Sequence, residues 1–201
     1  MGLEQLVMGF DSGDGRPLSV VSWNCQSVFM HMFESRGRAQ SKFRELQRLV
    51  RDHSVVYLQE THGELGDLDT LHRVLPDCCA VASFGAHPGV GGVAILYKKY
   101  LEAYYSVDPP VVVEEGRVIV VKFVGSAGSV VVANVHINPN HPTHTKISVL
   151  ADLLRQLPCS LDSFVVVGGD FNFTAENDPP VRLTTDSHTI TDKVISASTP
   201  A

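Results

Sequence analysis

Polar residues follow the apolar, β-branched runs of this chain at four separate places. They are Asn24, Gln59, Glu60, Asn134, His136, Asp170 and Asn172. Active-site groups gather at strand ends because a rigid sheet can aim side chains from distant parts of the chain into one cleft. Taken singly, Asn24 is also compatible with a turn, Glu60 with the acid at a helix start, and His136 with a hydrogen-bonded core imidazole. Together they predict a cleft of carboxylates, amides and an imidazole.

The elements that must position these residues follow from hydrophobic periodicity. Alternating or continuous apolar runs predict strands over 18–23, 54–58, 80–84, 93–97, 118–124, 130–136 and 164–168. Helical spacing predicts helices over 39–53, 65–75 and 143–157. The close middle strands favour antiparallel pairing, whereas the strand-helix-strand units favour mixed sheets. We therefore expect an α/β fold with two packed mixed or antiparallel sheets flanked by helices, a four-layer sandwich.

Length and composition bound the function classes. The chain has 201 residues, of which 44% are hydrophobic, and a formal net charge of −6. One domain with a real core fits this length. The negative charge argues against a protein that coats nucleic acid by bulk charge, but not against catalysis on a phosphate substrate. No membrane span or signal peptide is visible, so we expect a soluble intracellular protein whose four cysteines are reduced.

Several stretches, in order, resemble the endonuclease/exonuclease/phosphatase superfamily, which has the DNase I-like fold. They are LSVVSWNCQSV, VVYLQETH, GVGGVAILYKK, EEGRVIVVKF, VVVANVHINPN and VVVGGDFNFT. The sequences QETH, GGVAILY, EGR and GDFNF are most similar to those of the endonuclease domains of non-LTR retrotransposons. These domains are in turn similar to apurinic/apyrimidinic endonucleases. The resemblance implies a Mg²⁺-dependent phosphodiester hydrolase acting on DNA, with Mn²⁺ as a possible substitute ion.

The same resemblance implies roles for individual residues. Glu60 matches the carboxylate that binds the metal ion, and Asn24 matches the residue that orients this carboxylate and the phosphate. Asp170 matches the acid that positions or deprotonates the attacking water. Asn172 matches an amide donor to the phosphate, and His136 falls where relatives place a phosphate-contacting Tyr or His. Asn134 is expected to brace the site.

Three departures from the family pattern stand out. Gln26 replaces the Asp or Asn that many relatives carry two residues after the WN asparagine, which predicts weaker metal binding. No Ser-Asp-His motif follows GDFN; Asp186-Ser-His188 has these letters in another order. The Pro-Asn pair after His136 is also shifted by one residue, which leaves the roles of Asn138 and Asn140 open.

These departures lead to an expected domain plan. It has an N-terminal extension over 1–16, the family-like domain over 17–175 and a polar tail over 176–201, with the C-terminal end of the domain incomplete. We expect a fragment or decayed copy of a longer frame, with little activity in isolation. A downstream reverse transcriptase in the full-length protein and action in the nucleus follow by analogy with retroelements.

Two other functions remain open on the sequence alone. One is a phosphatase or phospholipase of the same superfamily acting on inositol phosphates or sphingomyelin, although the motif loops lack the Lys/Arg cluster and aromatic hairpin that such substrates favour. The other is a non-catalytic remnant that binds nucleic acid or a protein. The basic run from Arg36 to Arg51 is interpreted as the solvated face of its helix, with a DNA-phosphate patch as the alternative.

Overall fold

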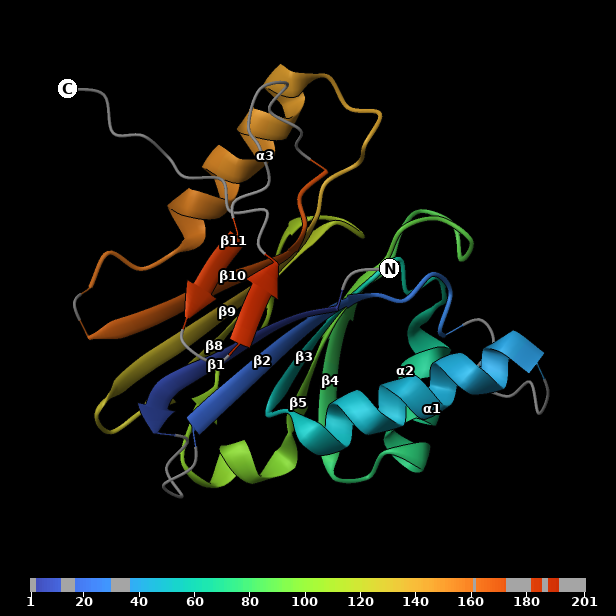
Figure 1. Ribbon diagram of the computed structural model, residues 1–201. Coiled ribbons are helices and arrows are strands. Elements are labelled where there is room, and N and C mark those ends of the chain that lie inside the picture. Colours follow the sequence, from blue (N-terminus) through green and yellow to red (C-terminus); the bar gives the residue numbers. More distant parts are fainter. Residues whose placement is uncertain are drawn as a thin grey trace.

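Two mixed sheets form the centre of the molecule in the computed structural model, which describes residues 3–11, 17–29, 37–160, 162–172, 182–185 and 188–191 (Figure 1). The strands of the first sheet, in chain order, are β1 (Leu3–Asp11), β2 (Pro17–Asn24), β3 (Val55–Gln59), β4 (Cys78–Ser83) and β5 (Val93–Lys98). Their order across the sheet is β1-β2-β3-β5-β4. Only β2 and β3 pair in parallel; the other pairs are antiparallel.

The second sheet has the order β10-β9-β8-β6, and β7 pairs with β8 beside this path. Its strands are β6 (Ser106–Val107), β7 (Val111–Glu114), β8 (Val118–Gly125), β9 (Gly128–His136) and β10 (Ser163–Asp170). Here β9 and β10 are parallel, and the remaining pairs are antiparallel. Each sheet therefore contains one parallel pair, which places two strand ends side by side.

Three α-helices cover the outer faces of the sheets. They are α1 (Gly37–Asp52), α2 (Leu65–Val74) and α3 (Thr143–Gln156); a 3₁₀ helix, η1 (Lys99–Ala103), follows β5. Helices α1 and α2 pack on the first sheet, and α3 packs on the second sheet from the opposite side (Figure 1). The expected four-layer α/β sandwich is confirmed.

Strict two-residue alternation explains how one sheet can bury both faces. In β3, Val55 and Tyr57 point between the sheets, whereas Val56 and Leu58 point toward the helices. In β9, Val132 points between the sheets in the same way. The Tyr57 hydroxyl donates to the Val166 carbonyl of β10 at 3.1 Å and so ties the two sheets together.

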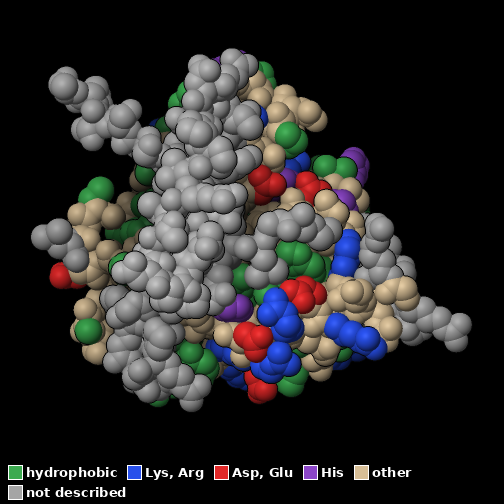
Figure 2. Space-filling view, in the orientation of Figure 1, with side chains coloured by type: hydrophobic (Ala, Val, Ile, Leu, Met, Phe, Trp, Pro, Cys, Tyr) green, Lys and Arg blue, Asp and Glu red, His purple; other side chains and the backbone are tan. Residues whose placement is uncertain are grey.

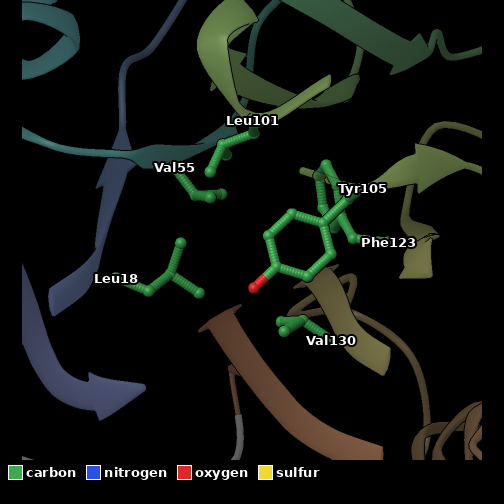
Figure 3. Close-up of a pocket in the computed structure, with 6 residues that line it drawn as sticks. All are labelled: Leu18, Val55, Leu101, Tyr105, Phe123 and Val130. Carbon is green, nitrogen blue, oxygen red and sulfur yellow. The ribbon is translucent and has the colours of Figure 1, made fainter. Parts of the chain in front are cut away.

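The inter-sheet layer is apolar at one end. A small cavity of about 10 Å³ lies there, lined by Leu18, Val55, Leu101, Tyr105, Phe123 and Val130. Figure 3 shows the Tyr105 ring lying among the aliphatic side chains of this cavity. A space of this size accommodates at most about one water molecule, so this end is essentially closed core.

Five strands differ from the sequence expectations. β1 lies in the segment expected to be an extension, and it pairs with β2 at the edge of the first sheet. The short strands β6 and β7 follow η1 and interrupt a segment rich in proline. The polar tail contains a hairpin of β11 (Arg182–Thr185) and β12 (His188–Thr191). The expected domain boundaries otherwise stay a prediction.

The structure bears on two further expectations, one about the cysteines and one about the basic helix α1. All four cysteines are free, and Cys78 and Cys79 point to opposite faces of β4 because they are consecutive in a strand. On α1, Arg48 pairs with Glu45 and Asp52, and Arg51 also pairs with Asp52. Figure 2 shows Lys/Arg and Asp/Glu side chains interleaved over this helix, not a patch of one sign.

In the described part of the chain, no helix is long and apolar enough to span a membrane.

Candidate active site

The inter-sheet layer becomes polar at the end opposite the cavity, because each inward-facing row of side chains ends in a polar residue. The parallel pair β2–β3 ends with Asn24 opposite Gln59, and the parallel pair β9–β10 ends with His136 opposite Asp170. Both pairs therefore present their carboxyl ends at the same edge of the sandwich. This topology brings together residues more than 100 positions apart.

A backbone scaffold joins the loops that leave these strands. The Cys25 N–H donates to the Gln59 carbonyl at 2.9 Å, and the Thr61 N–H donates to the Gly92 carbonyl at 3.1 Å. The Gly92 N–H in turn donates to the Gly116 carbonyl at 3.0 Å. Gly92 has a φ of +90°, and a Cβ there would lie 2.3 Å from Thr61 Oγ1. Only glycine allows this close approach between the loops.

Glu60 is held by two imidazoles. Its Oε1 lies 3.0 Å from His136 Nε2, and its Oε2 lies 3.0 Å from His62 Nε2. An ionised carboxylate has about four acceptor positions, so each oxygen keeps a further lone pair. The Glu60 side chain is 31% exposed, and it can therefore bind a second partner from the open side.

His136 is fixed in one tautomer by Arg117. The guanidinium Nη1 lies 2.9 Å from His136 Nδ1, and arginine can only donate, so Nδ1 is the acceptor. The ring proton then sits on Nε2 and is donated to Glu60. Burial, followed by the charge of Arg117, lowers the pKa of His136, while Glu60 and Asp170 oppose this shift. His136 is only 1% exposed, and both of its ring nitrogens are engaged by side chains, Nδ1 by Arg117 and Nε2 by Glu60.

Asp170 accepts two hydrogen bonds. The Asn24 side-chain amide donates to Asp170 Oδ2 at 3.2 Å, and the Asn172 backbone N–H donates to Oδ1 at 3.1 Å. The second bond is an Asx turn, which a GDFN sequence forms readily because Asn tolerates the left-handed φ of +45° found at Asn172. The sequence resemblance implies that Asn24 orients Glu60; the structure instead places its amide on Asp170, because β2 packs against β10 across the layer.

Asn172 is held by the loop after β9 and by α3. Its side-chain amide donates to the Ile137 carbonyl at 2.8 Å, and its own carbonyl accepts from Lys146 Nζ at 2.7 Å. Lys146 lies in the first turn of α3. This contact brings the side-chain amino group of Lys146 next to the residues that follow Asp170.

Asn134 lies deeper, beneath the site. Its amide nitrogen donates to the carbonyls of Leu58 and Ala94, each at 2.8 Å, and its Oδ1 accepts from Gln59 Nε2 at 2.6 Å. These bonds join β9 of one sheet to β3 and β5 of the other. Asn134 therefore braces the two sheets where the layer turns from apolar to polar.

The remaining sequence candidates lie at the margin or outside the described residues. Gln26 is exposed, and its backbone carbonyl accepts a hydrogen bond from Lys42 Nζ. The Asn138 side chain accepts from the Asn140 backbone N–H at 3.0 Å, which forms a local turn. Asp186 and Ser187 lie outside the described residues, and only the backbone of His188 is described, in β12.

Four residues join the site without having been assigned a role from the sequence. They are Ser27, His62, Arg117 and Lys146. His62 and Arg117 stand inside the quoted stretches QETH and EEGR, so the resemblance pointed to their neighbourhood. Nothing in their spacing indicated that His62 would reach Glu60 or that Arg117 would reach His136.

Backbone strain is concentrated in the same loops. Gln26, Ser27, Glu60, His62 and Asn172 are the non-glycine residues with positive φ in the described part of the chain, at +45°, +76°, +56°, +45° and +45°. Left-handed conformations of this kind cost free energy and cluster at active sites and ligand clamps. Their location supports a functional interpretation of this end of the sandwich.

The site offers oxygen ligands to a divalent cation. In the described part of the chain, no three His, Cys, Asp or Glu side chains are grouped to surround a metal ion. However, Mg²⁺ needs only one or two protein carboxylates and keeps several waters. Asn24 Oδ1 is buried and has no hydrogen-bond partner among the described groups. This orphaned oxygen, on the amide group that donates to Asp170, has the hard donor chemistry that such a cation prefers.

Solved structures with the same fold include three with functional names. They are TDP2 from D. rerio complexed with a single-strand DNA product (TM-score 0.56, 14% identity), ANGEL2, a 2',3'-cyclic phosphatase (0.58, 20%), and the endonuclease domain of the telomere-specific non-LTR retrotransposon TRAS1 (0.53, 12%). The matches cover 78%, 85% and 80% of this chain and 61%, 55% and 61% of those chains. At these identities they show the fold alone.

No curated protein matches this chain significantly. The model of the endonuclease/exonuclease/phosphatase family matches residues 21–196, which contain every site residue described above. Members of this family hydrolyse phosphate esters as nucleases or phosphatases. The fold, the strand-end carboxylates and this match agree, and the chain belongs to the endonuclease/exonuclease/phosphatase family.

Proposed function

We propose that this site hydrolyses phosphodiester bonds in DNA with a divalent cation, Mg²⁺ or Mn²⁺, as an endonuclease of the retroelement type. The observation that carries the proposal is that His136 joins two acids from different sheets: its Nε2 lies 3.0 Å from Glu60 Oε1, and it is the parallel-strand partner of Asp170. Carboxylates placed in this way can hold a cation and accept a proton, which are two requirements of phosphodiester hydrolysis.

The residues divide this work as follows. Asp170, oriented by Asn24 and Asn172, accepts the proton of the attacking water. The water oxygen bonds to phosphorus, the bond from phosphorus to a bridging oxygen breaks, and the departing oxygen leaves with the electron pair and takes a proton from solvent water. Asn172, held by Ile137 and Lys146, keeps a second amide hydrogen, which donates to a phosphate oxygen. A reaction of this type needs no covalent intermediate.

A cation would be held by Glu60 and by the unpartnered Asn24 Oδ1. When bound, it would supply positive charge against the non-bridging phosphate oxygens. Arg117 contributes through His136: it keeps the proton on Nε2, so the imidazole donates to Glu60 and leaves the carboxylate a pure acceptor. With Gln26 where many relatives carry Asp or Asn, Glu60 is the principal charged ligand.

DNA is the proposed substrate because two structural neighbours are named for DNA chemistry. One is TDP2 with a single-strand DNA product, and the other is a retrotransposon endonuclease. The family wording of QETH and GDFNF favours the second type. A reverse transcriptase partner and nuclear action belong to the same proposal. The chain matches only 50% to 68% of the length of the structures to which it is similar, so the activity of the whole protein is part of the proposal as well.

A small phosphoester is the second candidate substrate. The favouring observation is the neighbour described as a 2',3'-cyclic phosphatase, whose fold match covers 85% of this chain. Against it, the basic groups nearest the site are few, and Lys42 and Lys146 are both engaged with backbone carbonyls. A polyphosphorylated headgroup would favour more free cations.

Single-turnover cleavage tests the proposal even if the isolated chain is slow. The full 201-residue chain, in excess over 5′-labelled duplex or single-stranded DNA, is incubated with Mg²⁺ or with EDTA. We expect Mg²⁺-dependent cleavage that Asp170→Asn slows about 10²-fold or more, while the exposed Asp69→Asn on α2 cleaves normally. Parallel reactions use a 2′,3′-cyclic nucleotide and an inositol phosphate.

Each outcome of this experiment decides between the candidates. Cleavage of the small phosphoesters without cleavage of DNA would move the proposal to a phosphatase. Binding of DNA without Asp170-dependent hydrolysis of any substrate would leave a non-catalytic remnant of the family, in which neither Glu60 nor Asp170 has a catalytic role.

A further inference from the structure

His62 has no part in the reaction steps above, although it touches the proposed metal ligand directly. Its Nε2 lies 3.0 Å from Glu60 Oε2, and its Nδ1 lies 2.6 Å from Ser27 Oγ. The ring is largely sheltered, with 17% of its side chain exposed. A histidine with both nitrogens engaged in this way is oriented rather than free.

For a neutral His62 ring, the Glu60 carboxylate sets the hydrogen-bond directions of this chain of groups. An ionised carboxylate only accepts, so His62 Nε2 carries the proton and donates to Glu60. His62 Nδ1 is then an acceptor, and the Ser27 hydroxyl donates to it. One neutral tautomer satisfies all three groups at once. Because Nε2 carries a proton and Nδ1 faces Ser27, neither nitrogen offers a lone pair to a cation.

The backbone is strained at the three residues of this arrangement. Ser27, Glu60 and His62 all have positive φ, at +76°, +56° and +45°. The Ser27 N–H also donates to the Glu60 carbonyl at 2.6 Å, and the His62 N–H donates to the Gly91 carbonyl at 3.1 Å. The loop after β2 and the loop after β3 are therefore coupled through both backbone and side chains. Such costs persist where the surrounding structure requires the geometry.

We propose that His62, backed by Ser27, is a positioning residue that holds the Glu60 carboxylate in the orientation needed to bind the cation. The inference rests on the proposed function, because it takes Glu60 as the metal ligand. His62 occupies one lone pair of Glu60 Oε2, and His136 occupies one of Oε1. The remaining lone pairs of the carboxylate, on its outward side, are then available to bind a cation. Hydrogen-bond partners of ligating groups typically contribute 10- to 100-fold to metal affinity.

Mn²⁺ binding provides a readout that does not require turnover. The probe is Mn²⁺ alone, titrated into the full 201-residue chain and followed by the EPR signal of the free ion. We expect His62→Leu to weaken binding about 10- to 100-fold. His62→Gln is expected to stay within a few-fold of the original chain, because its side-chain amide can donate to Glu60 as Nε2 does. Ser27→Ala should fall between these two variants.

Two further variants set the scale. Glu60→Gln should give the largest loss of Mn²⁺ binding, and His72→Leu, which changes an exposed histidine on α2, should leave it unchanged. Folding of each variant is checked by chemical denaturation. If His62→Leu does not fold, the comparison of His62→Gln with Ser27→Ala and a ¹⁵N NMR assignment of the His62 tautomer take its place. A proton on Nδ1 would overturn the inference.

The two possible failures are distinguishable. If Glu60→Gln weakens Mn²⁺ binding but His62→Leu does not, or if His62→Gln loses as much as His62→Leu, the positioning role is wrong and the proposed function stands. If Mn²⁺ does not bind, or binds equally well without the Glu60 carboxylate, the proposed function and the positioning role both fail.

Discussion

The two ends of the inter-sheet layer are built from the same strands but differ in every physical property that matters for function. At one end, Leu18, Val55 and Val130 close around a cavity of about 10 Å³. At the other end, the same three strands lead to Asn24, Glu60 and His136, with hydrogen bonds in place of apolar packing. Positive φ values at non-glycine residues occur at the polar end among the described residues.

This difference shows how the fold separates stability from chemistry. Burial of apolar side chains at the closed end supplies free energy of folding, about 25 cal/mol per Å² of apolar surface. The polar end uses part of that free energy to hold strained loops and a buried, unpartnered Asn24 oxygen. The comparison predicts that substitutions at the two ends affect different observables.

The largest effect is expected for the acid at the polar end. Asp170→Ala should slow single-turnover phosphodiester cleavage about 10²- to 10⁴-fold, because it removes the proposed proton acceptor. Its free energy of unfolding should change little, since the two hydrogen bonds that Asp170 accepts are only part-buried. Cleavage assays and urea denaturation of the same preparation measure both. A large loss of stability together with normal cleavage would break the comparison.

The reverse pattern is expected at the closed end. Leu101→Ala removes a side chain that is 1% exposed in the inter-sheet core and should lower the free energy of unfolding by about 2–5 kcal/mol. Single-turnover cleavage at a temperature where the variant is folded should be unchanged. Leu65→Ala is the matched control, because Leu65 is 74% exposed and its loss should cost less than about 0.5 kcal/mol.

A glycine on β10, directly before Asp170, supports the polar end. Gly169 has a φ of +131°, and a Cβ there would lie 2.0 Å from the Val135 carbonyl oxygen. Gly169→Ala should therefore cost about 3 kcal/mol of stability and also displace Asp170, since the clash is with backbone. Gly66→Ala on α2, where a Cβ meets nothing within 4 Å, is the control. Near-normal denaturation of Gly169→Ala would contradict this close approach of β10 to β9.

The smallest effect concerns pH and a histidine outside both ends. His53 follows α1; burial lowers its pKa, Asp52 opposes that shift, and Arg48 adds to it. The unfolded chain then binds the proton more readily, so this contribution to stability is complete above about pH 6.5 and is lost as pH falls below that value. His53→Gln should flatten the fall in stability between pH 7.5 and 5.5, measured by urea denaturation. The exposed His72→Gln should leave the pH dependence as it was.

Periodicity was sufficient to predict most of the fold. Runs such as the one that became β9 alternate strictly between two hydrophobic layers, and the three helices begin and end within about three residues of the expected positions. β1 was not predicted because EQLVMGF mixes polar and apolar residues without clear alternation. β6 and β7 were not predicted because they are short and flank prolines. Their pairing depends on β8, which no local pattern records.

The site was predicted in its parts but not in its connections. Polar residues at strand ends identified Asn24, Glu60, His136 and Asp170, because a side-chain period of two can be read directly from a sequence. The partners of these residues depend on sheet packing: Asn24 meets Asp170 across 146 positions, and Arg117 meets His136 from a turn between strands. Short-range patterns contain no signal for such pairs, so Ser27, His62 and Arg117 emerged only from the structure.

The central claim is that Glu60 and Asp170 serve one hydrolytic site, and a double-mutant cycle tests it most directly. Single-turnover cleavage of labelled duplex DNA is measured for the original chain, Glu60→Gln, Asp170→Asn and the double variant. Residues that act as a unit are strongly non-additive. We predict that each single variant loses about 10²-fold or more and that the double variant is little slower than the slower single variant. Cleavage that persists in either single variant would contradict the claim.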